Sequence, residues 1–298
     1  MAQYCPAKKL EKLLVSTDGS EFSEGAVREA INLAKNCSIK LFAVSVVETN
    51  PEYEAIAPQL VEKAEKEARL HLESIKSRAS KEGVDCEIMV CQGEEPHKCI
   101  IEEAEKNKVN MIVLGRRGRK GFKRLMMGSE TARVIGHSPC NVNVLVVPRA
   151  AKLNFNNVLV ATDGSRYGDA AVSEAVNIAG SCNSRLIVMS VIPSETESPF
   201  DIVHLEMHKD LISERESKAA EEIVKAAKAL AEKQGVSVRG FILAGRPYEA
   251  IIETAKENKA DLIVVGSHGR TGLAKLLMGS VTERVIGLTE CAVLVVKA

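Results

Sequence analysis

The sequence predicts two tandem Rossmann-like domains of the doubly wound α/β class, each with a five-stranded, mostly parallel sheet flanked by helices. Three observations carry this prediction. The chain of 298 residues is about twice the ordinary length of a domain. One segment pattern occurs twice, and short apolar runs alternate with helical patterns throughout. Strands that alternate with helices favour a parallel sheet, because each helix carries the chain back over the sheet.

The first half of the chain is repeated in the second half. Leu13–Ala34 reads LLVSTDGSEFSEGAVREAINLA, and Val158–Ala179 reads VLVATDGSRYGDAAVSEAVNIA. The later segments Gly115–Gly136 and Gly266–Gly287 also agree at more than half of their positions. The segment Arg149–Asn157 lacks helical periodicity, so we place the boundary there and expect domains at 1–150 and 151–298.

Each copy contains five short apolar runs that predict strands. Between them, apolar residues recur every three or four positions, which predicts four helices per copy. Gly83 and Gly235 are expected to end helices, and Pro96 and Pro247 to begin them. The expected strands are Leu13–Val15, Leu41–Val47, Cys86–Val90, Met111–Leu114 and Val142–Val147, then Val158–Val160, Leu186–Ile192, Val236–Leu243, Leu262–Val265 and Ala292–Val296.

The composition excludes several classes of protein. The 40 basic side chains balance the 40 acidic ones, and aromatic residues make up only 3%, so a nucleic-acid partner is not expected. No apolar run reaches the length of a membrane span, and the first residues lack the apolar core of a signal peptide. We therefore expect a cytoplasmic protein with no membrane partner.

The eight cysteines predict no disulfide scaffold. None forms a CxxC pair, which argues against zinc ribbons and thioredoxin-like sites. Cys37 and Cys182 fall at equivalent places in the two copies, as do Cys140 and Cys291. We expect small buried apolar residues at these positions, in a reducing compartment.

The turn after the first strand of each copy carries an aspartate. Asp18 and Asp163 follow a buried strand and precede a helix, where ligands of doubly wound sheets bind. Each aspartate could cap the helix or accept hydrogen bonds from ligand hydroxyls. Ser20 and Ser165 could cap the helices equally well, so both roles stay open for the aspartates.

A glycine spacing follows the fourth strand of each copy. GSHGRTGLAKLLMGS (266–280) and GRRGRKGFKRLMMGS (115–129) share the pattern G-x2-G-x9-G-S. Glycines let the backbone approach a ligand, and the helix that starts at Gly279-Ser280 offers unpaired N–H groups for an anion. Arg270 could add a charged donor. The chain contains no P-loop, no GxGxxG after strand one, no GxSxG and no HExxH.

The glycine spacing and the aspartate turn together resemble the universal stress protein family, in its tandem form. The resemblance covers essentially the whole chain. It implies a stress-response regulator that binds ATP or another adenine nucleotide, with or without magnesium. In the second copy it implies that the nucleoside contacts Ala161, Thr162 and Asp163, and that the backbone of Val191 contacts the base. It also implies that the loop beside the ribose and phosphates is formed by Gly266, His268, Gly269 and Arg270. The phosphate-binding helix would begin with Gly279, Ser280, Val281 and Thr282.

The corresponding residues of the first copy differ in charge. Six basic residues lie between its glycines, and Glu130 stands where the second copy has Val281. A carboxylate in the first helical turn repels a phosphate, so we expect the second copy to bind nucleotide in the more family-like way. The first-copy residues are Ser16, Thr17, Asp18, Val46, Gly115, Arg117, Gly118, Arg119, Gly128, Ser129, Glu130 and Thr131.

The resemblance also bears on assembly and activity. The last strands of the two copies are expected to pair within the chain as an intrachain pseudo-dimer, and leftover edges make a homodimer a further candidate. A slow ATPase or a nucleotidyl-transfer enzyme is the alternative function, but no general base stands out beyond the two aspartates, so no catalytic residue is assigned.

Four histidines and one aspartate are other candidates for functional residues. Asp201, His204 and His208 fall at helical spacing and could hold zinc, but a fourth ligand is lacking, so no metal site is expected. His97 and His137 are interpreted as surface or capping residues.

Overall fold

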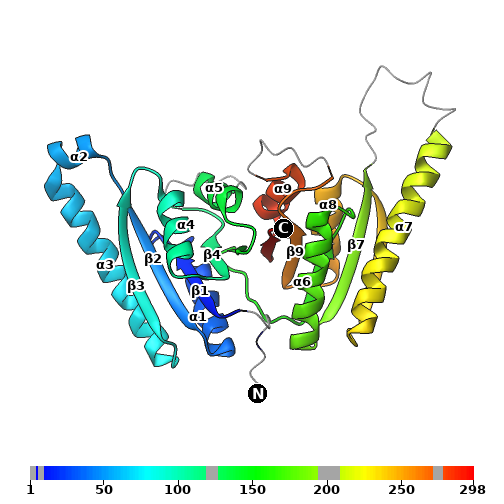
Figure 1. Ribbon diagram of the computed structural model, residues 1–298, viewed down its shortest axis with the longest axis horizontal. Coiled ribbons are helices and arrows are strands. Elements are labelled where there is room, and N and C mark those ends of the chain that lie inside the picture. Colours follow the sequence, from blue (N-terminus) through cyan, green and yellow to red (C-terminus); the bar gives the residue numbers. More distant parts are fainter. Residues whose placement is uncertain (1–4, 6–9, 119–126, 194–208, 271–277) are drawn as a thin grey trace.

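The computed structural model describes all residues except 1–4, 6–9, 119–126, 194–208 and 271–277 (Figure 1). The first copy contains β1 (Lys12–Ser16), α1 (Glu24–Cys37), β2 (Lys40–Glu48), α2 (Pro51–Ile56), α3 (Pro58–Lys81), β3 (Cys86–Gly93), α4 (Pro96–Lys106), β4 (Met111–Gly115), α5 (Ser129–His137) and β5 (Asn143–Val147). The second copy contains β6 (Asn157–Ala161), α6 (Arg166–Cys182), β7 (Arg185–Pro193), α7 (Lys209–Lys233), β8 (Val238–Gly245), α8 (Pro247–Glu257), β9 (Leu262–Gly266), α9 (Ser280–Leu288) and β10 (Ala292–Val296).

The strands of both copies join into one ten-stranded sheet with the order β3-β2-β1-β4-β5-β10-β9-β6-β7-β8. In the middle of the sheet, β5 and β10 form the only antiparallel pair between the described strands, with Leu145 opposite Leu294. Every other pair is parallel. The fold class is confirmed, and the expected pairing of the last strands is present. The domain limits at 150 and 151 stay a prediction, because the stretch between β5 and β6 has no regular structure that fixes them.

Helices cover both faces of the sheet because the strands are apolar on both sides. Alternate residues of one strand face opposite layers: Leu13 and Val15 pack with α1 and α3, whereas Leu14 packs with α4 and α5. β4 and β9 are buried at every position, as expected for central parallel strands. In Figure 1, α3 and α7 lie at the outer ends, and α5 and α9 lie near the middle.

The helix boundaries follow local signals. Pro96 and Pro247 occupy the first positions of α4 and α8, and Gly83 and Gly235 have φ of +76° and +72°, so both sets of predictions are confirmed. The short helix α2 was not expected. Asn50 starts it by accepting a hydrogen bond from the Tyr53 N–H at 2.7 Å.

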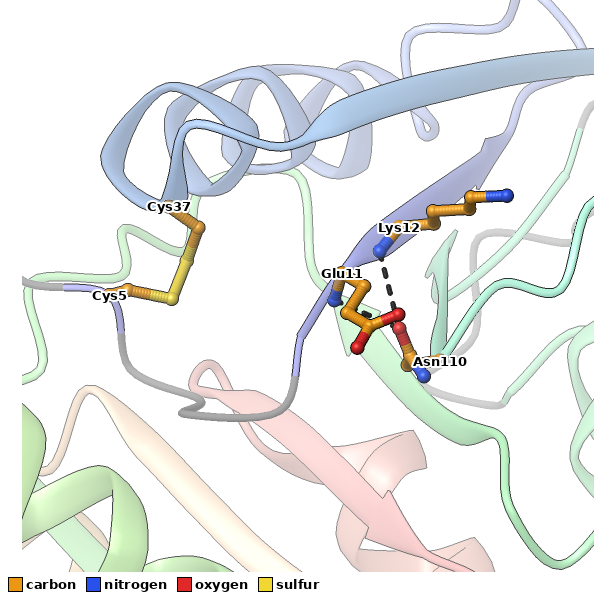
Figure 2. Close-up of a disulfide and its surroundings, with 5 residues drawn as sticks. All are labelled: Cys5, Glu11, Lys12, Cys37 and Asn110. Carbon is orange, nitrogen blue, oxygen red and sulfur yellow. Dashed lines mark hydrogen bonds between the residues drawn. A yellow bond between two sulfur atoms is a disulfide. The ribbon is translucent and has the colours of Figure 1, made fainter.

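One cysteine prediction is wrong. Cys37, at the end of α1, forms a disulfide with Cys5 and is not a buried apolar residue (Figure 2). Cys140 is also not buried but exposed, whereas Cys182 and Cys291 are half-buried thiols. Figure 2 also shows that the Asn110 side chain accepts hydrogen bonds from the N–H groups of Glu11 and Lys12 at 2.9 and 3.2 Å, which holds the start of β1.

Two basic residues link the copies at helix ends. Arg116 Nη1 donates to the carbonyls of Gly287 and Thr289 at 3.3 and 2.7 Å, at the end of α9. Lys297 Nζ donates to the carbonyls of Ile135 and Gly136 at 2.8 and 3.3 Å, near the end of α5. Cations stabilise the unpaired carbonyls of a helix C-terminus, so each copy completes a helix of the other.

Candidate functional site

The second copy has a cavity of about 380 Å³ at the carboxyl ends of β6 and β9. These two strands are neighbours in the sheet although β7 follows β6 in sequence, so the cavity lies where the strand order reverses. All of the residues expected at the site of this copy line it: Ala161, Thr162, Asp163, Val191, Gly266, His268, Gly269, Arg270, Gly279, Ser280, Val281 and Thr282.

Hydrogen bonds between Asp163 and Arg270 connect the glycine loop to the turn after β6. Its Oδ2 accepts a hydrogen bond from the Arg270 N–H at 2.7 Å, and its Oδ1 accepts one from the Ser165 N–H at 3.0 Å. Arg270 Nε donates to the carbonyl of Asp163 at 2.6 Å. Ser165 caps α6 by accepting from the Gly168 N–H at 3.1 Å. Of the two roles left open for Asp163, helix capping therefore belongs to Ser165, and Asp163 orders the loop.

The three glycines of the spacing differ in what a side chain at each position would contact. A Cβ on Gly269 would lie 2.8 Å from Asp163 Oδ2, so that glycine lets the carboxylate reach the loop. A Cβ on Gly266 would lie 2.7 Å from the backbone of Tyr167, so this glycine is needed for packing against α6 rather than for ligand approach. A Cβ on Gly279 would meet nothing closer than His268 Cα at 3.5 Å. The protein's own packing therefore leaves room for a side chain at Gly279.

The start of α9 is open to the cavity. Gly279 is the residue before the helix, and no side chain caps the first turn. Ser280 is exposed, and its hydroxyl makes no hydrogen bond to any residue the structure describes. Thr282 Oγ1, in contrast, donates to the carbonyl of Gly266 at 2.9 Å and is buried. The Thr282 hydroxyl thus ties the helix to β9, and the first residues of α9 line the cavity with a helix start that no side chain caps.

Strand geometry directs the backbone of Val191 at the cavity. Thr162 N–H donates to the carbonyl of Met189 at 3.0 Å just past the end of β6. Val191 lies two residues beyond Met189, so its N–H and C=O point to the same side, where β6 no longer runs. Apolar side chains that include Met189, Ile251 and Val265 line the space around it. This half of the cavity therefore combines an apolar lining with the backbone N–H and C=O of Val191.

The first copy has a cavity of about 600 Å³ at the equivalent place. Eleven of the twelve expected residues line it: Ser16, Thr17, Asp18, Val46, Gly115, Arg117, Gly118, Gly128, Ser129, Glu130 and Thr131. Arg119 lies outside the described residues, as do Lys120, Lys123 and Arg124 of the basic run.

The turn after β1 is built differently from its counterpart. Asp18 Oδ1 accepts hydrogen bonds from the N–H and hydroxyl of Ser20 at 3.0 and 2.7 Å. Ser20 does not cap α1, which begins at Glu24 after Ser23, and Ser23 makes no side-chain cap either. The possibility that Ser20 caps this helix is therefore wrong. Thr17 is buried, and its hydroxyl lies 3.1 Å from His71 Nε2 on α3.

Glu130 of the first copy is held by a neighbouring helix. Its Oε2 accepts a hydrogen bond from the His97 N–H at 3.1 Å, and its Oε1 accepts one from Arg133 at 2.9 Å. The carboxylate therefore caps the start of α4 while it also lies at the start of α5. Val281 at the same place in the second copy brings no charge.

The interpretation of His97 as a surface or capping residue is wrong. It is 3% exposed, its ring lies 5.0 Å from that of His137, and its own N–H is capped by Glu130. His137 is exposed, as expected.

Two features of the sites were missed at the level of sequence. The long helices α3 and α7 wall the cavities: Ala64 and Glu67 line the first, and Glu216 and Ala220 line the second. The sequence pattern predicts helices here but does not place them at the cavities, because only the three-dimensional path after β2 and β7 brings them to the site.

The described residues contain neither a candidate metal site nor a candidate membrane-spanning helix. They contain no group of three or more His, Cys, Asp or Glu side chains able to hold a metal ion, and Asp201, His204 and His208 lie outside them. In the part of the chain that the structure describes, no helix has the length and apolar character needed to cross a membrane.

Comparison with known proteins agrees with the duplication. The universal stress protein family model matches residues 9–148 and again residues 154–297. A universal stress protein of Methanocaldococcus jannaschii is 39% identical over 143 residues, which are 48% of this chain and 82% of that protein. Another from Bacillus subtilis is 35% identical over 147 residues, 48% of this chain and 99% of that protein. The crystal structure of a universal stress protein from Archaeoglobus fulgidus is similar in fold over 96% of both chains, with a TM-score of 0.69 and 22% identity.

Proposed function

Because the chain belongs to the universal stress protein family, we propose that its second copy binds ATP or another adenine nucleotide, with or without magnesium, and that the bound nucleotide regulates a stress response. The observation that carries the proposal is the start of α9, where Gly279 has room for a Cβ and no side chain caps the first turn. A phosphate oxygen accepts hydrogen bonds from such N–H groups and is favoured by the helix dipole.

Each part of a nucleotide has suitable partners in this cavity. The backbone of Val191 and the apolar wall suit the base, and Ala161, Thr162 and Asp163 suit the ribose hydroxyls. Gly266, His268, Gly269 and Arg270 form the loop beside the phosphates. Gly279, Ser280, Val281 and Thr282 form the helix start. The Ser280 hydroxyl is the free donor there, since that of Thr282 is engaged with Gly266.

The first copy is proposed to bind nucleotide more weakly through its equivalent residues. Glu130 adds negative charge where the phosphates would lie, although Arg117 and Arg133 also line that cavity. The β5–β10 pairing would make the two copies an intrachain pseudo-dimer in which one sheet holds both sites.

Mass spectrometry of the purified chain tests the proposal. We expect an adenine nucleotide to be released on denaturation, and Asp163→Ala to reduce its amount far more than Asp18→Ala does. A chain that carries no nucleotide and does not bind added ATP would contradict the proposal. Phosphate release at rates typical of enzymes, lost in Asp163→Ala, would instead favour the slow ATPase or nucleotidyl-transfer enzyme.

A further inference from the structure

We propose that a cavity between the two copies, which shares only Arg117 with the first-copy nucleotide cavity and no residue with the second, binds an organic anion with an apolar body. The cavity measures about 840 Å³. Its walls come from both copies: from the turns after β1 and β4, from the segment after β5, and from α8 and the end of α9. Ligand cavities of roughly 300–1,000 Å³ occur preferentially at domain interfaces. This inference goes beyond the proposed function and does not depend on it.

The inner wall of this interdomain cavity is apolar. Phe22 and the linker residues Ala150 and Ala151 form one side, and Ile252 and Leu288 form the other. Leu288 is 38% exposed at the end of α9, whereas Val285 and Ile286 of the same helix are buried. An exposed leucine inside a concave surface gains from contact with an apolar ligand, because that contact removes it from water.

The rim of the cavity is basic. It carries Arg116, Arg117, Arg149, Lys152, Lys256 and Lys259, against two carboxylates, Asp261 and Glu290. Arg149 is paired with Glu21, but none of the three lysines forms a salt bridge with a residue that the structure describes. The rim therefore has an excess of positive charge, and concave surfaces with charge of one sign attract counter-ions.

Arg116 adds a half-buried guanidinium to the lining of the cavity. Its Nη1 is engaged with the end of α9, yet no carboxylate of the described chain forms an ion pair with its guanidinium. Burial and the neighbouring charge of Arg117 lower the pKa of Arg116, and Glu290 offsets this only in part. A ligand carboxylate or sulfonate near Arg116 would supply the missing negative charge through charge-assisted hydrogen bonds.

The apolar wall and the basic rim together determine which class of ligand fits the cavity. A bare phosphate would leave the apolar wall unused, and a neutral apolar molecule would leave the rim unused. A carboxylate or sulfonate on an aliphatic or aromatic body uses both. The fluorescent probe 1-anilinonaphthalene-8-sulfonate and the fatty acid dodecanoate have this chemistry.

The test titrates the full chain with the fluorescent sulfonate and then displaces it with dodecanoate. We expect saturable binding, competition by dodecanoate, and no displacement by ATP. Lys256→Glu/Lys259→Glu should weaken binding about tenfold or more, since two rim charges are reversed. Lys63→Glu/Lys66→Glu on α3 is the matched control, with two exposed lysines at the same spacing, and it should bind like the parent chain.

A second variant probes the apolar wall without a charge change. Leu288→Gln, at a half-exposed position that tolerates a polar side chain, should weaken dodecanoate binding several-fold. The proposal is overturned if binding is not saturable, if the two lysine pairs have equal effects, or if ATP displaces the probe, which would place it in a nucleotide cavity. ATP titrations of the same variants measure the nucleotide proposal separately, since none of these residues lines a nucleotide cavity.

Discussion

The two copies share one backbone plan and one glycine spacing, yet they differ at the helix start that faces each cavity. In the second copy, no side chain caps the start of α9, Val281 is uncharged, and the carboxylate of the first turn is that of Glu283. In the first, Glu130 at the start of α5 reaches across to cap α4 above the buried His97. The two copies therefore share the glycine spacing but not the charge two positions after its third glycine, and we propose that this charge sets the affinity for a phosphate there.

The largest expected difference between the copies comes from the disulfide. Cys5–Cys37 closes a loop with a sequence separation of 32, which constrains the unfolded chain by about 3–4 kcal/mol in the loop-entropy model. The equivalent Cys182 has no disulfide partner among the described residues. Reduction with dithiothreitol should therefore destabilise α1 and leave α6 unchanged, as measured by hydrogen exchange of peptides from the two helices. Cys5→Ser should reproduce the effect without reductant, and equal loosening of α1 and α6 would contradict it.

A smaller effect distinguishes the glycines within one loop. Gly266→Ala places a methyl group against the Tyr167 backbone, and we expect a loss of about 1–3 kcal/mol in the free energy of unfolding. Gly279→Ala should change the free energy of unfolding by no more than about 0.5 kcal/mol. Urea unfolding of the two variants measures both values. The interpretation of Gly266 as a packing residue fails if the two variants are equally stable.

Exchanging the charged residue should exchange the behaviour of the copies. Glu130→Val removes the carboxylate from the first cavity, and we expect ATP affinity there to rise about tenfold, or about 1.4 kcal/mol. The same change removes the cap of α4 and should cost about 1 kcal/mol of stability. Val281→Glu should lower affinity in the second copy by a similar factor. Calorimetric titration with ATP measures both, and Val281→Gln is the uncharged control of similar size.

The smallest expected effect is on alkaline stability. Burial raises the pKa of the thiols of Cys86, Cys91 and Cys182 to about 11 from an ordinary value of 9.0. Between these values the folded chain holds protons that the unfolded chain has released, so the free energy of unfolding falls as pH rises from 9 to 11. Urea titrations at several pH values should show this fall, and Cys182→Ala should make it shallower. A fall of equal steepness in that variant would exclude a contribution from this thiol.

Much of the fold could be predicted from the sequence because its signals are local. Apolar runs such as Leu262–Val265, the prolines at the starts of α4 and α8 and the glycines at helix ends each act within a few residues. The Cys5–Cys37 bond, the burial of His97 and the wall formed by α3 and α7 depend on where distant segments meet. The periodicity of apolar residues does not predict such contacts between segments that are distant in sequence.

At the candidate site, too, the sequence predicts local features but not contacts between distant segments. The sequence was sufficient to predict that Asp163 and the glycine loop belong to the site. It did not show which of Asp163 and Ser165 caps the helix. The hydrogen bonds from Arg270 to Asp163 and from Gly168 to Ser165 decide this. Likewise, the role of Gly266 depends on the backbone of Tyr167 on a neighbouring helix.

The central claim is that the second copy holds the nucleotide more tightly than the first. Its most direct test is calorimetric titration of ATP into the parent chain, Gly279→Val and Gly128→Val, each confirmed to melt like the parent. We predict that Gly279→Val removes the tight binding event, lowering affinity by about 100-fold or about 2.7 kcal/mol, because its side chain blocks the start of α9. Gly128→Val should leave that event unchanged. Equal losses of ATP affinity in the two variants would contradict the claim.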